Sequence, residues 1–210
     1  MTNDEKFHVQ RHSDREVHDR LNIDGLLDSQ YVAHVGFIDP DINAPFVIPM
    51  GVARDNDRIL LHGSTGSRMM RQIAQGIDLC VTVTQLNAIV VARSSFNSSM
   101  NYESVMVFGV ARVLEDSEKD IALERITEKL VPGLSKYGRP LVSKEIAATM
   151  IVELTLDKLS AKSRDGDPID DDEDVALPIW AGILPIETKL GTPITAANAA
   201  GIAVPSHIAN

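Results

Sequence analysis

The segment between residues 58 and 76 holds the residue types best suited to binding a ligand. It reads Arg-Ile-Leu-Leu-His-Gly-Ser-Thr-Gly-Ser-Arg-Met-Met-Arg-Gln-Ile-Ala-Gln-Gly, so a strand-like run leads through a loop of small residues into a short amphipathic helix. The glycines let the backbone approach an anion, and the hydroxyl and guanidinium groups donate hydrogen bonds to it. The loop from Gly63 to Arg68 is therefore a candidate phosphate site. Taken alone, such a loop is more often a plain helix cap at Ser64 or Thr65.

Two neighbouring features also contain groups able to do chemistry. His62 stands directly before the glycine loop, where a histidine either handles a proton or bonds a backbone carbonyl. Residues 92–105 form a long run of hydroxyl and amide side chains that includes Phe96, Met100 and Tyr102. This combination suits a pocket that hydrogen-bonds a flat polar ligand and packs against its faces.

Other chemistries find little support in the sequence. His8 and His12 have helical spacing but lie in a segment expected to fray, so no metal site is predicted. Cys80 falls within an apolar strand pattern and is expected to be buried and inert. The acidic run at 164–174 lacks the glycine spacing of a calcium loop and is expected to be solvated. No Walker, dinucleotide-binding or serine-hydrolase motif is present.

The composition is that of one ordinary globular domain. The chain has 210 residues, of which 44% are hydrophobic and 24% charged, enough for a single core. A net charge of −10 argues against nucleic acid as a partner. One cysteine, a polar N-terminal segment and the lack of a long apolar run predict a cytoplasmic protein that does not enter a membrane.

Short strands dominate the pattern along the chain. Strands are expected at 31–38, 46–53, 58–62, 78–84, 87–94, 104–113 and 150–157, and helices at 14–30 with a break near 22–25, at 67–75, at 116–130 and at 143–148. Pro49 places its strand at an edge or a bulge. We therefore predict a mainly β fold with accessory helices (α+β), built as an antiparallel barrel. Residues 11–190 would form one domain, with flexible tails at 1–10 and 191–210.

Five motifs follow one another in an order that resembles a known family. They are Arg-Ile-Leu-Leu-His-Gly-Ser-x-x-Ser-Arg at 58–68, Ala-Arg-Ser-Ser-Phe at 92–96, Ser-Met-Asn-Tyr-Glu-Ser-Val at 99–105, Ser-Ala-Lys-Ser-Arg at 160–164 and Pro-Ile-Trp-Ala-Gly-Ile-Leu-Pro at 178–185. This order resembles the pyridoxamine 5′-phosphate oxidase-like flavin proteins, and among them the nitroimidazole-resistance branch. The resemblance implies an FMN-binding split β-barrel that forms a homodimer with flavin sites at its interface. It also implies reduction of a small electron acceptor, such as a nitroaromatic compound, through FMN.

The same resemblance assigns roles to residues. The residues that it implies in flavin binding are Pro49, Met50, Gly51, Val52, His62, Gly63, Ser64, Ser67, Arg68, Ser99, Asn101, Tyr102, Ser104 and Trp180. Ser67 and Arg68 are the implied main phosphate ligands, His62 the implied catalytic residue, and Trp180 a cap supplied by the partner chain or an anchor of the core or interface. Glu103 departs from the family pattern, which has a basic residue there. The pyridoxal-phosphate signature of the oxidase is not evident, so vitamin B6 oxidation is not implied.

Two other functions stay open at this point. The barrel would serve as a flavin store or sensor if it had no turnover of its own. Relatives with the same architecture bind haem or a deazaflavin, so the ligand is the second open question.

Overall fold

Within the described residues, 7 and 9–209, the computed structural model has nine strands and five α-helices. The strands are β1 (Val32–Asp39), β2 (Ala44–Asp55), β3 (Arg58–Ser64), β4 (Asp78–Val91), β5 (Ser99–Val110), β6 (Arg112–Val113), β7 (Thr149–Thr155), β8 (Leu159–Arg164) and β9 (Gly182–Pro185). The helices are α1 (Arg20–Ser29), α2 (Arg68–Ile73), α3 (Asp116–Leu130), α4 (Leu134–Tyr137) and α5 (Ser143–Ala148), with 3-10 turns at Ser13–Arg15, Ser95–Asn97 and Ala197–Ala199.

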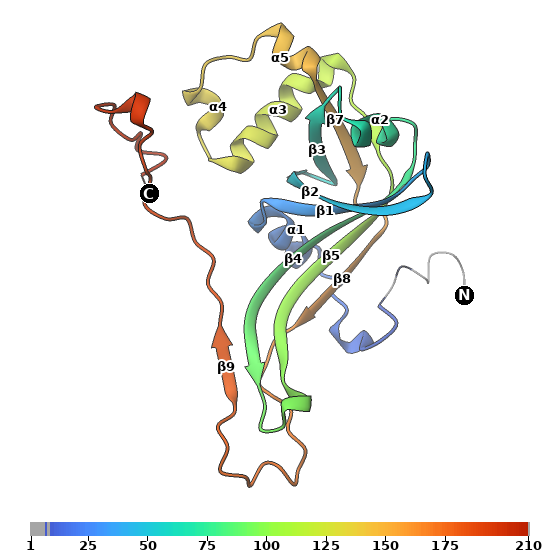
Figure 1. Cartoon of the computed structure of the whole chain (residues 1–210), viewed down its shortest axis with the longest axis vertical. Coiled ribbons are helices and arrows are strands. Elements are labelled where there is room, and N and C mark those ends of the chain that lie inside the picture. Colours follow the sequence, from blue (N-terminus) through green and yellow to red (C-terminus); the bar gives the residue numbers. More distant parts are fainter. Residues whose placement is uncertain (1–6, 8, 210) are drawn as a thin grey trace.

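All the strands belong to one antiparallel sheet. Its order is β6-β7-β3-β2-β1-β4-β5-β8, and β9 pairs with β4 beside this path. The sheet curls into a half-barrel, with α1 near its middle and the other helices around β3 and β7 (Figure 1). The prediction of a mainly β, antiparallel split barrel with accessory helices is confirmed.

Strand β2 connects the two parts of the curled sheet. Its residues 44–51 pair with β1, whereas residues 52–55 pair with β3. Pro49 lies opposite His34 of β1, at a point where β3 no longer runs alongside. Because proline has no N–H to donate, it is tolerated where a strand has a neighbour on one side only. The edge position predicted for Pro49 is confirmed.

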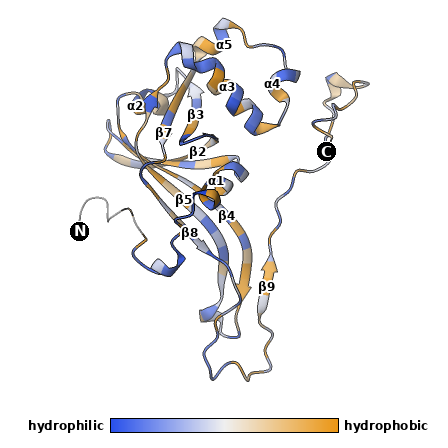
Figure 2. Ribbon diagram, turned by 180° about the vertical axis from the view of Figure 1, so that it is seen from behind, coloured by the Kyte–Doolittle hydropathy of each residue, from blue (hydrophilic) through white to orange (hydrophobic). Residues whose placement is uncertain are grey.

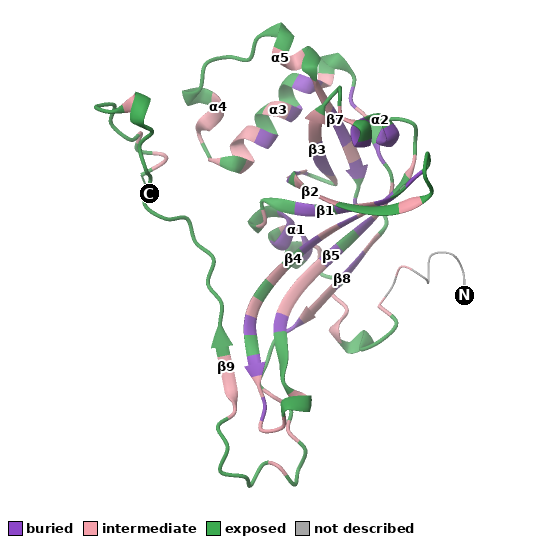
Figure 3. Cartoon of the chain, in the orientation of Figure 1, coloured by how far each residue is buried: buried purple, intermediate pink, exposed green. Residues whose placement is uncertain are grey.

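The hydrophobic residues form two cores on opposite faces of β3. Inside the half-barrel, strand residues pack with Leu27 of α1 and Met70 of α2. On the outer face, α3 contributes Ile126 to a smaller core with β2, β3 and β7 (Figure 3). Successive strand residues point to opposite faces, so Leu61 enters the first core and Leu60 the second.

Some predicted boundaries were wrong for local reasons. Helix α1 begins only at Arg20, because the carboxylate of Asp19 accepts the N–H of Leu21 at 3.2 Å and caps the helix there. It runs through Gly25 without the expected break. The two strands expected at 78–84 and 87–94 are one strand, β4, which absorbs a register shift after Leu86 instead of turning.

Strands β4 and β5 form a long hairpin that leaves the barrel. Strand β1 pairs with β4 only between residues 34–36 and 80–82, so the outer part of the hairpin extends away from it (Figure 1). Strand β8 pairs with β5 on one side, and β9 pairs with the end of β4 on the other. The chain beyond β9 is mostly exposed (Figure 3). The short strands β8 and β9 were not predicted, because each depends on a partner far away in the sequence.

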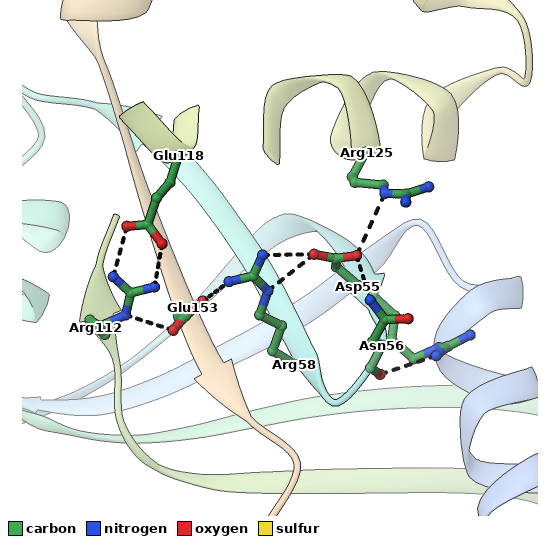
Figure 4. Close-up of polar contacts among 8 residues, drawn as sticks. Asp55, Asn56, Arg58, Arg112, Glu118, Arg125 and Glu153 are labelled. Atoms are coloured by element: carbon green, nitrogen blue, oxygen red, sulfur yellow. Dashed lines mark hydrogen bonds and ion pairs between the residues drawn. The ribbon is translucent and has the colours of Figure 1, made fainter. Parts of the chain in front are cut away.

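A network of ion pairs joins β3, β6 and β7 on the outer face of the sheet (Figure 4). Glu153 accepts hydrogen bonds from Arg58 and, at 2.7 Å, from Arg112. Arg112 donates two further bonds to Glu118, both at 2.8 Å, and these hold the pKa of Glu118 at about 2. Burial alone would raise the pKa of Glu153, but its bonds from Arg112 and Arg58 lower it below the ordinary value.

We expect Glu153→Gln to reduce the free energy of unfolding at pH 7 by about 1–3 kcal/mol, because two guanidinium groups lose their shared anion. Chemical denaturation measures the change, with Glu124→Gln on the exposed side of α3 as the matched control. The folded pKa of Glu153 is lowered from 4.5, so its contribution is present above that pH and is lost as the pH falls through the folded value. Equal stabilities of variant and wild type at pH 7 would contradict this role.

Candidate functional site

Strands β2 and β3 place Gly51 beside His62. The ladder pairs Val52 with Leu61, so the next two residues outward face each other. The imidazole Cε1 of His62 lies 3.8 Å from the position that a β-carbon on Gly51 would take. With glycine at this position, the volume that a β-carbon would fill stays open beside the imidazole ring. Gly51 lies in the part of β2 that pairs with β1 but has no strand partner on the other side.

His62 is half-buried and keeps one free ring nitrogen. Its Nδ1 is buried and has no hydrogen-bond partner in the described structure. Burial disfavours the charged imidazolium and lowers the pKa of His62 below 6.5. A neutral imidazole with an unpartnered nitrogen is able to accept or hold a proton for a bound molecule. The alternative of a bond from Nδ1 to a backbone carbonyl is not observed.

The loop between Gly63 and Arg68 is closed by its own hydrogen bonds. The N–H groups of residues 65–67 donate at 2.9–3.1 Å, one to Ala148 and two to Ser64. The hydroxyl of Ser67 accepts an N–H of the first turn of α2 at 3.4 Å. Ser67 is therefore the helix cap, rather than Ser64 or Thr65. Because these backbone N–H groups are already bonded, a phosphate at this loop would be bound by side chains, above all by the guanidinium of Arg68.

Gly63 has a structural reason to be glycine. A β-carbon there would lie 2.8 Å from Cγ of Met70 in α2. The close packing of α2 onto β3 accounts for this residue without any ligand.

Arg68 is paired with two carboxylates at the end of β1. Its Nη2 lies 2.7 Å from Oδ2 of Asp39 and 3.6 Å from Oδ2 of Asp41. Gln72 of α2 donates to Asp41 at 3.1 Å. Sequence reasoning used Asp39 only to end a strand and missed this cluster. The available signal was the pair of acidic residues on either side of Pro40.

Asp39 is a buried carboxylate that stays ionised. Its side chain is only 3% exposed. Burial raises its pKa, but the neighbouring amide of Gln72, the N–H of Asp41 and the charge of Arg68 lower the pKa below the ordinary 3.8. A fixed negative charge therefore stands next to the predicted phosphate ligand.

The predicted residues of β5 lie on the hairpin, away from α2 and β3 (Figure 1). Asn101 is buried and has a structural role. Its side-chain carbonyl accepts from Arg164 of β8, and its amide donates to the carbonyl of Gly166 at 3.1 Å. Asn101 thus fastens the loop after β8 to the hairpin, and its role in flavin binding stays a prediction.

The other predicted residues of this region remain accessible. Ser99 and Trp180 are exposed, and Trp180 retains 62% of its surface. Tyr102 and Ser104 are half-buried, opposite Leu86 and Thr84 of β4. A single chain thus presents the predicted residues in two groups, one around His62 and one on the hairpin, and does not bring them together.

Among the acidic residues of the run at 164–174, Asp170 is an anchor with a buried side chain. This side chain is 5% exposed and accepts the backbone N–H of Arg93 at 2.7 Å and its guanidinium at 2.6 Å. The expectation of a wholly solvated run is wrong at this residue. Cys80 is half-buried rather than buried.

The sequence predicted neither a metal site nor a membrane-spanning segment. Within the described residues, no group of three histidine, cysteine or acidic side chains is placed to hold a metal ion. His8, one half of the possible histidine pair, lies outside that part of the chain. No helix of the described chain has the length and apolar character needed to cross a membrane.

We expect the imidazole of His62 to titrate with a midpoint below pH 6.5, because burial penalises its charged form. An NMR pH titration measures this, and the spectrum of His62→Gln assigns the resonance. The folded pKa is depressed, so the stabilising effect of the neutral ring is present above pH 6.5 and is lost as the pH falls through the folded value. A midpoint at or above 6.5 would show an exposed or ion-paired ring instead.

Comparisons with known proteins agree with this architecture. The family model described as pyridoxamine 5′-phosphate oxidase matches residues 19–163. The solved structure of the FAD and heme binding protein from Mycobacterium smegmatis is 38% identical, with a TM-score of 0.89 over 92% of this chain and 95% of that one. The flavocytochrome Anf3 from Azotobacter vinelandii is 34% identical, with a TM-score of 0.90 over 97% of this chain and 94% of its own.

A more distant structure shares the fold. It is a candidate 5-nitroimidazole antibiotic resistance protein from Bacteroides thetaiotaomicron, 20% identical, with a TM-score of 0.55 over 70% of this chain and 86% of that one. No curated protein matches the chain. Since the family model spans most of the chain, and two structures exceed 30% identity over more than nine tenths of it, the chain belongs to the pyridoxamine 5′-phosphate oxidase family.

Proposed function

We propose that this protein is a flavin-binding redox protein that also binds haem. The observation that carries the proposal is its likeness, over nearly the whole chain, to a protein described as FAD and heme binding and to a flavocytochrome. The sequence motifs led us to expect FMN, whereas the Mycobacterium protein is described with FAD. Both flavins share the ring, the ribityl chain and the first phosphate, so the same residues would meet either one.

The surroundings of His62 fit a flat polar ring. Residues 49–51 of β2 pair with β1 but have no strand partner on the side of β3. Backbone groups on such an edge are free to bond the polar rim of a ligand. Gly51 leaves room, and the buried Nδ1 of His62 lacks a partner. These features, with the guanidinium of Arg68 beyond them, would hold the ring at one end and its phosphate at the other.

A bound flavin supplies transfer of hydride or of single electrons. The residues of this chain would bind and orient the ring, and the imidazole of His62 would supply a proton to the acceptor as it is reduced, or orient the acceptor. The acceptor that we propose is a small oxidant such as a nitroaromatic compound. Reoxidation of the reduced protein by such a compound under anaerobic conditions distinguishes this enzyme from a flavin store without turnover.

Haem requires an axial ligand, and the described chain offers histidines with suitable nitrogens. Haem iron is held in proteins by histidine, cysteine, methionine or tyrosine. His62 is already assigned to the flavin ring, whereas His207 keeps a buried Nε2 without a hydrogen-bond partner in the described structure. The imidazole of His207 is a donor whose chemistry fits haem, which supports the second cofactor.

We also propose a cytoplasmic homodimer with its flavin sites between the two copies. The ribbons of β4 and β9 include hydrophobic residues (Figure 2). The hairpin and β9 have exposed apolar side chains that a second copy would cover. They are Leu86, Ile89, Met100 and Leu184. In a dimer the hairpin of one copy would bring Ser99, Tyr102 and Ser104 to the His62 group of the other.

We expect the purified protein to be coloured, with flavin absorbance and a Soret band, because both cofactors would remain bound. Denaturation and chromatography of the released flavin identify it as FMN or FAD. Deazaflavin fluorescence in place of flavin absorbance would change the ligand while keeping the fold. A colourless protein that stays colourless after incubation with FMN, FAD and haem followed by dialysis would overturn the proposal.

We expect sedimentation to give a mass close to twice that of the 22.9 kDa chain. Leu86→Glu should dissociate the dimer, since it places a charge on the exposed apolar hairpin. Ile121→Glu changes an equally apolar, exposed residue of α3 and should leave the dimer intact. A monomeric wild type, or equal behaviour of the two variants, would argue against an interface on the hairpin.

A further inference from the structure

We propose that Asp39, assisted by Asp41, makes this site select FAD over FMN. The inference rests on the proposed flavin site, with the phosphate beside Arg68. It concerns a difference in charge between the two flavins. FMN ends in a phosphate monoester, whereas the two phosphates of FAD form a diester.

The charges around the predicted phosphate position cancel. Arg68 and Arg71 bring two positive charges from α2, and Asp39 and Asp41 bring two negative charges from the end of β1 and the turn after it. The charge of Arg68 is engaged, because its Nη2 lies 2.7 Å from Oδ2 of Asp39. A ligand that approaches Arg68 therefore meets a cation whose charge is already balanced.

Asp39 is not free to move aside. Its Oδ1 accepts the N–H of Asp41 at 2.9 Å, and its backbone carbonyl accepts the N–H of Asn43 at 2.8 Å. The carboxylate thus forms part of the turn between β1 and β2. If a ligand drew Arg68 away, the buried carboxylate would lose its cation, and an unpaired buried charge is strongly unfavourable. Arg68 must therefore keep its ion pair with Asp39 while it binds the ligand.

These charges affect the monoester phosphate of FMN and the diester phosphates of FAD differently. A phosphate monoester carries a charge of about −1.5 to −2 at pH 7, because its second pKa is near 6. Each phosphate of a pyrophosphate diester carries one negative charge, and the second lies farther along the chain. Asp39 and Asp41 balance the charge of Arg68, and this balance removes more attraction from the doubly charged phosphate of FMN than from the singly charged first phosphate of FAD. Side-chain donors such as the Ser67 hydroxyl remain adequate for a singly charged phosphate.

The test compares the dissociation constants of FAD, FMN and riboflavin for the cofactor-free wild type and for Asp39→Asn, by quenching of flavin fluorescence. Asparagine keeps the oxygen that accepts the N–H of Asp41 but removes the charge. We expect the wild type to bind FAD more tightly than FMN. In Asp39→Asn the affinity for FMN should rise about tenfold relative to FAD, while riboflavin, which lacks phosphate, should bind as before.

Two further variants make the result specific. Asp41→Asn, at the more exposed carboxylate 3.6 Å from Arg68, should shift the ratio in the same direction by a smaller factor. If Asp39→Asn fails to fold, Asp41→Asn alone tests whether a carboxylate beside Arg68 sets the ratio of the two affinities. Asp57→Asn removes an equal charge at the far end of β2, where Asp57 pairs with Arg20, and should leave the ratio unchanged.

The possible failures are distinguishable. If neither the wild type nor any variant binds a flavin, riboflavin included, the proposed function itself is wrong. If flavins bind but the wild type prefers FMN, or the ratio is unchanged in both Asp39→Asn and Asp41→Asn, only the selection by these carboxylates is overturned. A parallel change in riboflavin affinity would mean that Asp39 acts by shaping the turn rather than by charge.

Discussion

The burial of β3 on both faces is the constraint on which the rest of this molecule depends. Leu60 and Leu61 are almost fully buried, one under α3 and the other inside the barrel. A shift of β3 by one residue would exchange these faces and leave neither core filled. The register that the two leucines fix also sets His62 opposite Gly51 and carries the chain into α2, which begins with Arg68. The hydrophobic effect thus positions the polar groups of the candidate site.

What the sequence could predict depends on how local the cause is. Helix α3 was predicted with its observed bounds, since its signals lie within the helix itself: an apolar face, and Glu118, whose carboxylate accepts the N–H of Glu115 at 2.9 Å. The single strand β4 was predicted as two strands, 78–84 and 87–94, with a turn between them. In the structure the side chains of Gln85 and Asn87 bond each other at 2.8 Å across a bulge, and β5 continues alongside. Pairing with β5 therefore keeps β4 continuous where the local sequence pattern predicted a turn.

The candidate site shows the same division between local and distant causes. The motif around His62 lies within one strand and one loop, so the sequence identified it. Asp39 and Arg68 are far apart in the chain and meet only because β1 ends beside the start of α2. The family resemblance implies that Asn101 binds the flavin, and the structure adds its bonds to Arg164 and Gly166, which belong to a later part of the chain. Residue type alone could not predict these distant partners.

The balance of charge at Arg68 has a consequence for how the site would hold a flavin. Ion pairs that are already satisfied add little attraction for an anion, and the chain as a whole carries a net charge of −10. Most of the binding free energy would then come from the ring, through the free edge of β2, the space beside Gly51 and the apolar surface of a second copy. In the proposed dimer, the ring would be contacted by residues of two chains, and cofactor binding would then be linked to dimerisation.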